Sequence, residues 1–503
     1  MPKVNLDGNS LVLEDLIAIG NKKMKVALSQ KAKENVQAAR KVVDKILEEN
    51  QVVYGVTTGF GQFSNVVIPH DQVEQLQYNL IRSHSAGVGE FFSEDIARMI
   101  MTLRANVLAK GRSGISLEVL ELLIEMINRG IYPLIPEKGS VGASGDLAPL
   151  AHLASVLIGE GRARYDAFEG SGAVILKKAG LKPCQLHAKE GLALINGTQV
   201  MTAVGAKALH TALYLAETAD IIGALTLEAL KGTATAFDER IHAERPYPGQ
   251  LKCAENFRNL LKESEIMASH KDCGKVQDSY TLRCIPQVHG PVRDTLEYIE
   301  KMLTIEMNSA TDNPMVFAGD DVLLSGGNFH GQSVAFLMDF LKIAIAELGN
   351  ISERRTERLV NPALSGLPAF LVREGGLNSG LMLSQVTAAA LVSENKILCH
   401  PASIDSIPTS GNKEDHVSMG TIAARKAYEV VENVETILAI ELLAAVQALE
   451  FLKPLKPAKP LLPVIEKIRA HILPWDTDRN MSADIQTMKT LIRERALTRL
   501  VNP

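Results

Sequence analysis

Three long stretches with apolar residues at helical spacing constrain the fold of this chain most. Residues 198–230, 332–360 and 421–452 are rich in Ala, Leu, Ile and Val. The third would form a helix on the order of 48 Å long at the standard rise per residue. The first has apolar residues on all sides, which is typical of a helix buried within a bundle. These stretches predict a mainly α fold built on a bundle of very long helices.

The composition fits one large helical assembly better than a string of average domains. Hydrophobic residues make up 46% of the 503 residues and aromatic residues only 5%, so the apolar excess lies in aliphatic side chains. We expect residues 1–197 to form a smaller N-terminal part, and residues 198–503 to form the long-helix bundle and the C-terminal helices.

The net charge and the cysteine content limit the kinds of partner and the cellular compartment that we expect. The net charge of −5 disfavours nucleic acid or an anionic membrane as a main partner. The five cysteines are odd in number and include no CxxC pair, which disfavours a disulfide framework or a zinc site. No apolar run has the length of a signal peptide or a membrane span. We therefore expect a soluble, cytoplasmic protein. The cysteines are Cys184, Cys253, Cys273, Cys284 and Cys399.

A glycine-rich segment, residues 139–150, carries the most unusual local chemistry. Three glycines in seven residues leave the backbone free to adopt positive φ and to turn back on itself. Asp146 can cap the helix that follows, and Pro149 is tolerated in its first turn. A turn or an anion site at a helix N-terminus is the simplest interpretation.

The tripeptide Ala143-Ser144-Gly145 within this segment is also able to cyclise. The unhindered Gly145 nitrogen could attack the Ala143 carbonyl, and loss of two waters, one from the Ser144 hydroxyl, would leave a ring with an exocyclic methylidene. Such a ring is an electrophile, which ordinary side chains do not supply. The following helix N-terminus would favour negative charge on it.

This segment resembles the signature of the aromatic amino acid ammonia-lyases, and the resemblance extends over nearly the whole chain. The catalytic group of that family is a methylidene-imidazolone (MIO) formed autocatalytically from Ala-Ser-Gly, with no external cofactor. The resemblance implies that Ala143, Ser144 and Gly145 are catalytic. It also implies an aspartase/fumarase-like helical fold and a homotetramer whose active sites are shared between chains.

Two residues of the N-terminal part gain a role from this resemblance. Tyr54 lies in a glycine-punctuated loop and, taken alone, is a packed aromatic between helices; the family loop holds a catalytic tyrosine over the MIO. A tyrosinate is basic enough to take a carbon-bound proton if its surroundings lower its pKa. His84, beside glycines, could be structural. Ser83-His84 is similar to the pair in the histidine-specific members, where it would recognise the imidazole of the substrate.

The resemblance also implies roles for Asn196 and Phe329. Asn196 ends an apolar run, and a buried amide is usually part of the scaffold; by resemblance it contacts the substrate and the MIO. Phe329 lies in the tight loop 326–331, which resembles the family segment that sets an aromatic ring beside the MIO, where it would shield the site from water.

Glu414 matches a glutamate that is distinctive of the histidine-specific members, near the substrate imidazole or amine. Lys413 departs from the more usual Gln of that pattern. It could lower the pKa of Glu414 or point to solvent. Glu414, Asp415 and His416 together suggest a metal cluster, but adjacent residues do not converge on one ion, and we expect no metal.

The segment 277–287 is the densest polar cluster of the middle section. Tyr280 and Arg283 are three residues apart and would share one face of a helical turn. An arginine fork suits a substrate carboxylate, although an ordinary salt bridge is the plainer alternative. By resemblance, Arg283 binds the carboxylate, Tyr280 assists at the reacting centre and Gln277 orients the substrate.

The predicted reaction is non-oxidative elimination of ammonia from L-histidine to give urocanate, the first step of histidine degradation. The MIO would capture the substrate through its amine, and attack through the ring is the rival route. A tyrosine or phenylalanine ammonia-lyase or aminomutase is the alternative within the family. A non-catalytic helical scaffold is the alternative outside it.

Local patterns predict three further features. Residues 164–186 are the most strand-like part of the chain and predict a small hairpin, with 170–172 between its strands. The charged run 353–358 indicates a solvated helix face or a subunit contact. Lys-Pro recurs at 453–454, 456–457 and 459–460, a period that fits a polyproline II connector.

Overall fold

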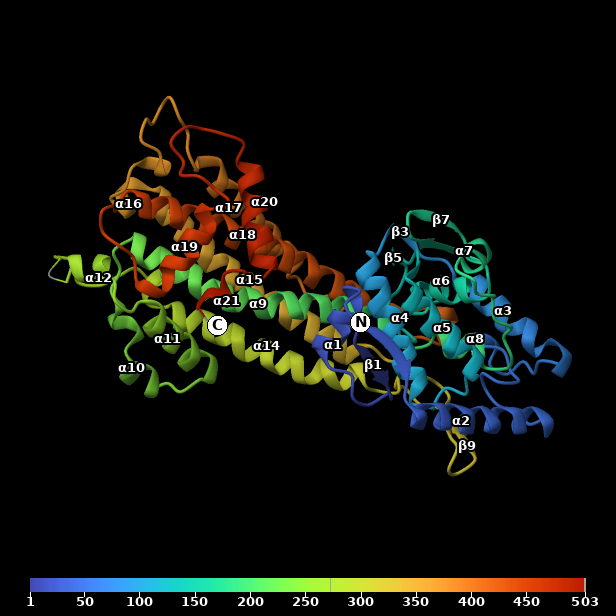
Figure 1. Cartoon of the computed structure of the whole chain (residues 1–503). Coiled ribbons are helices and arrows are strands. Elements are labelled where there is room, and N and C mark those ends of the chain that lie inside the picture. Colours follow the sequence, from blue (N-terminus) through green and yellow to red (C-terminus); the bar gives the residue numbers. More distant parts are fainter. Residues whose placement is uncertain (272, 502–503) are drawn as a thin grey trace. The chain divides into compact units, whose positions relative to one another are not determined.

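The computed structural model describes residues 1–271 and 273–501 (Figure 1). Helices dominate these residues, and the strands form only small sheets of two or three members. The predicted mainly α fold is therefore confirmed. The described chain contains no helix whose length and apolar character would let it cross a membrane.

The chain divides into two compact units, and neither is continuous in sequence. Unit 1 comprises Met1–Lys207, Glu300–Asp339 and Pro401–Arg425, and unit 2 comprises Ala208–Ile299, Phe340–His400 and Lys426–Pro503. The N-terminal part expected at 1–197 lies within unit 1. Four long helices each contribute residues to both units: α9 (Gln199–Ala229), α14 (Ile285–Met307), α15 (Gln332–Val360) and α18 (Gly420–Glu450).

These long helices follow the apolar spacing of the sequence closely. The helix predicted at 198–230 is α9, the one at 332–360 is α15, and the one at 421–452 is α18. Buried residues occur along α9 with little interruption, as expected for a helix that is packed on all sides.

The rest of unit 1 contains short helices and all of the strands. Its helices are α1 (Leu13–Gly20), α2 (Gln30–Glu48), α3 (Val73–His84), α4 (Glu94–Ala109), α5 (Leu117–Arg129), α6 (Ala148–Leu157), α7 (Gly172–Lys178) and α8 (Glu190–Ile195). Its strands are β1 (Lys3–Leu6), β2 (Lys25–Leu28), β3 (Val88–Phe91), β4 (Ile131–Pro133), β5 (Pro136–Lys138), β6 (Arg162–Tyr165), β7 (Phe168–Ser171), β8 (Met315–Phe317) and β9 (Val322–Leu324).

The strands of unit 1 pair in four small sheets. β1 and β2 are parallel, with Lys3 opposite Lys25; β3 pairs with β5, and β8 with β9, in antiparallel fashion. The largest sheet has the antiparallel order β4-β6-β7. The other α-helices of unit 2 are α10 (Glu239–Ala243), α11 (Pro248–Leu260), α12 (Glu265–Ser269), α13 (Tyr280–Arg283), α16 (Pro362–Ser365), α17 (Met382–Leu398), α19 (Leu462–Arg469), α20 (Met481–Arg493) and α21 (Thr498–Val501).

α2 shows how local sequence sets an element of unit 1. The Ser29 hydroxyl accepts a hydrogen bond from the Ala32 amide at 3.1 Å and so caps the helix. Val36, Val43 and Ile46 recur at helical spacing and are buried. Val43 and Ile46 belong to a core cluster that also includes residues of other segments: Val56, Val73, Ala188 and Val316. In Figure 1, α2 lies along one edge of unit 1, beside β9.

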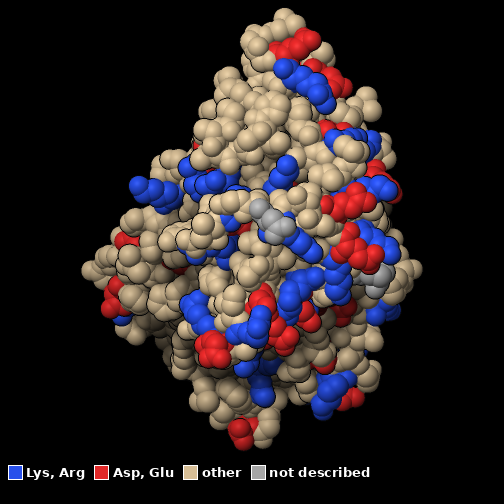
Figure 2. All heavy atoms as spheres, turned by 90° about the vertical axis from the view of Figure 1, so that its left-hand side faces the viewer, with Lys and Arg blue, Asp and Glu red and all other residues tan. Residues whose placement is uncertain are grey.

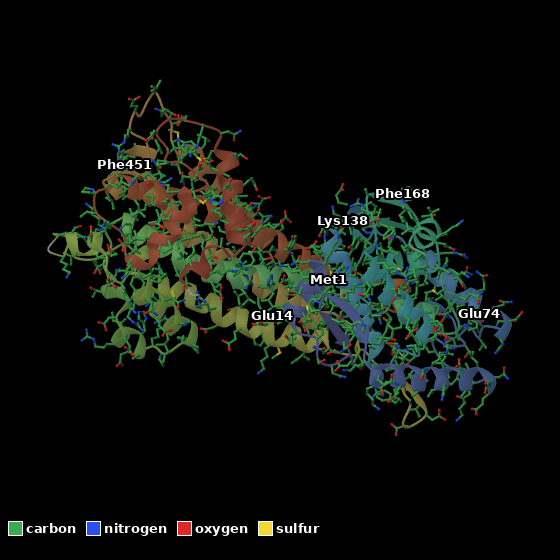
Figure 3. The ribbon with its side chains drawn as sticks, in the orientation of Figure 1. Met1, Glu14, Glu74, Lys138, Phe168 and Phe451 are labelled. Carbon is green, nitrogen blue, oxygen red and sulfur yellow. The ribbon has the colours of Figure 1, made fainter. Side chains whose placement is uncertain are left out.

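The predicted hairpin at 164–186 is only partly correct. β6 and β7 do form one, but the turn lies at Asp166 and Ala167, and residues 172–178 form α7 instead of a second strand. Phe168, labelled in Figure 3, is 41% exposed at the start of β7, and the Lys178 ammonium of α7 lies 4.5 Å from the centre of its ring. Helix α7 thus folds against the hairpin.

Two further predictions in unit 2 need correction. The charged run is a solvated face only in part, since Arg354 is exposed but Glu353 and Arg355 are buried, and Arg355 forms an ion pair with Glu441 of α18. Residues 451–454 form turns, and the single-turn helix Lys459–Leu461 follows, so the Lys-Pro repeat is not a polyproline II connector. In both cases a local pattern is overridden by tertiary packing.

Candidate active site

A cavity of about 880 Å³ in unit 1 gathers most of the expected site residues. They come from separate elements: a turn between α2 and α3, the end of α3, the glycine-rich segment, the end of α8, and the loops that precede α15 and α18. The expected residues that line it are Tyr54, His84, Ala143, Ser144, Asn196, Phe329 and Glu414. Their convergence gives unit 1 one polar site with aromatic walls.

The backbone around Ser144 is held tightly against the end of α8. Gly145 and Gly197 form an isolated parallel bridge, in which the Asp146 amide donates to the Gly197 carbonyl at 2.7 Å. Gly145 has a φ of +72°, and a Cβ on it would lie 2.1 Å from the Gly197 oxygen. Only glycine fits there. Leu147 also has a positive φ, +46°, which stores strain at the exit of the segment.

Asp146 does not cap the helix that follows it, contrary to the sequence prediction. Helix α6 begins at Ala148, while the Asp146 carboxylate accepts hydrogen bonds from the Val200 and Met201 amides at the start of α9. Thr421 Oγ1 donates to the same carboxylate at 2.8 Å. Burial raises the pKa of Asp146 to about 7, against these hydrogen bonds. Pro149 does lie in the first turn of α6, as predicted.

Ser144 is in direct contact with Glu414. The Ser144 hydroxyl donates to Glu414 Oε1 at 3.2 Å, across 270 residues of sequence. The other carboxylate oxygen, Oε2, accepts hydrogen bonds from the Thr409 and Ser410 hydroxyls, both at 2.7 Å. The carboxylate is therefore oriented from one side while it contacts the serine from the other.

Tyr54 and His84 are both perturbed by burial in the cavity. Burial raises the pKa of Tyr54; the Gly61 amide acts in the opposite direction, and the negative charge of Glu414 adds to the rise. Burial lowers the pKa of His84, although a hydrogen bond with the Leu80 carbonyl and the charge of Glu414 partly offset this. The lowered pKa that would favour a Tyr54 tyrosinate is therefore not found.

A buried polar network holds Asn196. Its Nδ2 donates to Asp312 Oδ1 at 3.2 Å and to the Asn313 carbonyl at 3.1 Å. Its backbone carbonyl accepts a hydrogen bond from Arg104 Nη1 at 2.6 Å. The Lys189 ammonium forms an ion pair with the Asp312 carboxylate at 3.2 Å. Asn196 Oδ1 is buried and accepts no hydrogen bond from the described residues. It is a free acceptor on a residue that lines the cavity.

Phe329 and two histidines form another part of the wall. Phe329, His330 and His416 all line the cavity, and the two histidine rings stack with centres 5.6 Å apart. Sequence reasoning missed His330 and considered His416 only as part of a metal cluster, although both lie within the segments that contain Phe329 and Glu414. Arg104, Lys189 and Asp312 were also missed. These three resemble ordinary helix or turn charges in sequence, so no local signal marks them.

Gln277, Tyr280 and Arg283 belong to unit 2 and do not line the unit 1 cavity. Tyr280 and Arg283 do share a helical turn, α13, as their spacing predicts: the Arg283 guanidinium lies 4.6 Å from the centre of the Tyr280 ring. Gln277 and Arg283 line a separate pocket of about 720 Å³ within unit 2. Arg283 Nε is buried and has no hydrogen-bond partner among the described residues.

One buried cluster in unit 2 has the composition of a metal site. Asp220, Cys253 and His289 bring their donor atoms within 4.8 Å of one another. However, the His289 ring, the Cys253 thiol and Arg293 all hydrogen-bond the Asp220 carboxylate. Burial also raises the pKa of the Cys253 thiol well above its ordinary value. A guanidinium ion and a protonated thiol suit a structural network better than a cation site.

Comparison with known proteins adds independent information. The chain matches the aromatic amino acid lyase family over residues 11–470. It is 58% identical over 433 residues to a histidine ammonia-lyase of Alkaliphilus oremlandii, covering 86% of this chain and 85% of that protein.

Two solved structures share the fold over nearly their whole length. Histidine ammonia-lyase from Trypanosoma cruzi is 48% identical, with a TM-score of 0.93, over 100% of this chain and 95% of that one. Tyrosine aminomutase from Streptomyces globisporus is 40% identical, with a TM-score of 0.94, over 100% of this chain and 98% of that one. Proteins named for different amino acids therefore have this fold, and identity is higher towards the two histidine ammonia-lyases.

Proposed function

The chain belongs to the aromatic amino acid lyase family, and we propose that it eliminates ammonia from L-histidine without oxidation, giving urocanate. The observation that carries this proposal is the single cavity lined by Ala143, Ser144, His84 and Glu414. It joins the tripeptide able to cyclise to two polar groups suited to an imidazole. The high identity to histidine ammonia-lyases supports the same substrate.

The residues around Ser144 fit a methylidene-imidazolone made from Ala143-Ser144-Gly145, with no external cofactor. The bridge between Gly145 and Gly197 holds the backbone of the tripeptide, and the free Asn196 Oδ1 offers an acceptor at the cavity. Once formed, the ring supplies an electrophile that makes the substrate amine a better leaving group.

Tyr54 takes the β-proton of the substrate in this proposal. Its phenol faces the same cavity as Ser144, and a phenolate is a strong base once formed. Because burial and Glu414 raise its pKa, the phenolate is scarce at neutral pH. The proposed role therefore predicts a reaction that speeds up in alkaline solution.

His84 and Glu414 recognise the substrate ring. The lowered pKa keeps His84 neutral near pH 7, so that its ring can exchange one hydrogen bond with an imidazole without charge repulsion. A site built for such a bond rejects phenyl rings, which leave the buried polar groups unpaired. Phe329 and Asn196 complete the site: the first excludes water and the second offers its amide oxygen.

Arg283 binds the substrate carboxylate, with Tyr280 assisting and Gln277 orienting the substrate. These residues lie in unit 2, so we propose a homotetramer in which they act at the cavity of another subunit. Exposed apolar side chains on α15 and α17 support a subunit interface. They are Phe340, Ile343, Leu383, Val386 and Ile397. Mixing inactive Ser144→Ala and Arg283→Lys subunits should then restore partial activity.

We also propose the cellular compartment of the protein and the kinds of partner that its surface disfavours. All five cysteines are free, which suits a reducing compartment, and we propose the cytoplasm. On the face drawn in Figure 2, Lys and Arg are interspersed with Asp and Glu, so that face has no wide basic area for nucleic acid or an anionic membrane.

The assay follows product formation with matched substrates. L-histidine should give the ultraviolet absorbance of urocanate, while L-tyrosine and L-phenylalanine should give no coumarate, cinnamate or β-amino acid. The Ser144→Ala variant should be inactive. Turnover of tyrosine in place of histidine would favour the aromatic lyase or aminomutase alternative, and no turnover of any of them would favour a helical scaffold.

A further inference from the structure

The hydrogen bond between Ser144 and Glu414 joins the one hydroxyl that must leave during ring formation to a carboxylate. Its length is 3.2 Å, from Ser144 Oγ to Glu414 Oε1. Both residues line the cavity, and Ser144 lies at the centre of the tripeptide that condenses. Because the contact is made by the Ser144 hydroxyl, which ring formation removes, it bears on the formation of the catalytic group.

The Glu414 carboxylate is held firmly in this position. Thr409 and Ser410 each donate a hydroxyl to Oε2 at 2.7 Å, which leaves Oε1 for Ser144. The backbones of Thr409 and Glu414 also pair in an isolated antiparallel bridge. Ser410, Gly411 and Asn412 between them all have positive φ, from +50° to +64°. This tight turn fixes the carboxylate before the chemistry begins.

Ring formation requires two dehydrations with different proton demands. In the first, the Gly145 nitrogen bonds to the Ala143 carbonyl carbon, and the carbonyl oxygen leaves as water with the Gly145 and Ser144 amide hydrogens. In the second, the Ser144 Cα–H bond and the Cβ–Oγ bond break, and a double bond forms between Cα and Cβ. The hydroxyl leaves as water only if it receives the proton lost from Cα.

We propose that Glu414 relays this proton: its carboxylate accepts the Ser144 Cα proton and returns it to Oγ as the Cβ–Oγ bond breaks. The carboxylate ends as it began, so no further reactant is needed. This inference rests on the proposed function, because it presumes that the ring forms. It gives Glu414 a task in maturation that precedes its contact with the substrate.

Two other acid–base groups near the tripeptide suit this task less well. Asp146 directs both carboxylate oxygens to the start of α9 and to Thr421. Tyr54 has a raised pKa, so its phenolate is scarce at neutral pH. Glu414 is the carboxylate that hydrogen-bonds the departing hydroxyl.

Intact mass of the purified full chain tests the relay without any activity assay. Wild-type protein should be lighter than its sequence mass by about 36 Da, for two waters. Glu414→Gln keeps the shape and an acceptor oxygen but cannot carry the proton. This variant should accumulate as a species about 18 Da lighter than its sequence mass, because the first dehydration proceeds and the second does not. In cell-free synthesis, its second dehydration should slow by about 100-fold or more.

Two controls make the result specific. Lys413→Gln changes the exposed neighbour of Glu414 and should mature fully at the wild-type rate. Thr409→Val/Ser410→Ala keeps the carboxylate but removes its two hydroxyl donors, and should slow only the second loss of water. If Glu414→Gln does not fold, as judged by circular dichroism, this double variant decides: an unchanged rate overturns the relay.

The possible outcomes separate the relay from the proposed function. Full loss of two waters in Glu414→Gln at the wild-type rate overturns the relay, and if that protein is inactive towards histidine, Glu414 acts in turnover alone. A wild-type protein that loses no water removes the electrophile itself, and with it the proposed function. Accumulation of the one-water species in Glu414→Gln, with full maturation of Lys413→Gln, supports the relay.

Discussion

Gly197→Ala would test whether the backbone at the end of α8 shapes the condensing tripeptide. The substitution leaves Ala143-Ser144-Gly145 unchanged. Gly197 has a φ of +139°, and a Cβ there would lie 2.7 Å from the Thr311 carbonyl oxygen and 2.6 Å from Gln199 Oε1. Since such contacts require at least 3.0 Å, the backbone must shift by about 0.3 Å. The bridge to Gly145 would be displaced with it.

The expected cost has two parts. A non-glycine residue at this φ costs about 1–3 kcal/mol, and the forced contact adds about 1–3 kcal/mol. The variant should therefore unfold at lower temperature and retain a large fraction of chain that has lost no water, both measured on one sample by calorimetry and intact mass. Gly376→Ala is the matched control, since its φ is +101° but a Cβ would meet nothing within 4 Å. The reasoning is refuted if Gly197→Ala matures fully and is as stable as Gly376→Ala.

Two further predictions follow from groups described above. Because burial and Glu414 raise the pKa of Tyr54 from its ordinary value, kcat/KM should rise with pH in alkaline solution, and Tyr54→Phe should lower kcat by about 10²–10⁴-fold; a flat profile would exclude Tyr54 as the base. Arg355→Met should lower the free energy of unfolding in urea by about 3–5 kcal/mol, because it leaves the Glu441 carboxylate buried without its ion pair. Arg355→Met/Glu441→Leu should recover most of that loss, and a double variant as unstable as the single one would contradict this account.

Local sequence predicted the elements whose causes are local. The helices α9, α15 and α18 follow from apolar spacing over about thirty residues. Such features need no knowledge of the rest of the chain. The turn of Tyr280 and Arg283 is of the same kind, since spacing alone brings their side chains together.

The predictions that failed concern residues whose partners lie far away in the sequence. An aspartate before a helix has the same local chemistry whether it caps that helix or another, and Asp146 takes the amides of Val200 and Met201, more than fifty residues away. The charge of Arg355 gives no sign of burial in sequence, because its partner Glu441 lies on α18. A pattern can indicate polarity, but the partner determines burial.

The site itself was accessible from sequence only through resemblance. Spacing gives no reason to bring Tyr54, His84 and Glu414 together, since they lie on separate loops and helices, yet all three line one cavity. Thr409 and Ser410 could not be anticipated, because their role depends on the tight turn that points their hydroxyls at Glu414. Resemblance supplies the reacting groups, whereas the structure supplies what orients them.

The buried charges beneath Asn196 show why that orientation matters more than stability. Arg104, Lys189 and Asp312 are buried, and burial lowers the pKa of Arg104 to about 10 despite nearby carboxylates. Buried ion pairs often contribute no more to stability than apolar residues of similar volume. These groups do fix Asn196, through hydrogen bonds to its backbone carbonyl and from its Nδ2, and they leave its side-chain Oδ1 without a hydrogen bond from the described residues. We infer that the network is retained to aim this oxygen.

Lys189→Met/Asp312→Leu separates the two explanations, because it removes the pair and one hydrogen bond to Asn196 together. If orientation is the purpose, the free energy of unfolding should change by only about 1 kcal/mol, while kcat should fall by about 10-fold or more, since small misplacements are costly for catalysis. A variant that keeps wild-type kcat and loses stability would show instead that the network serves the fold.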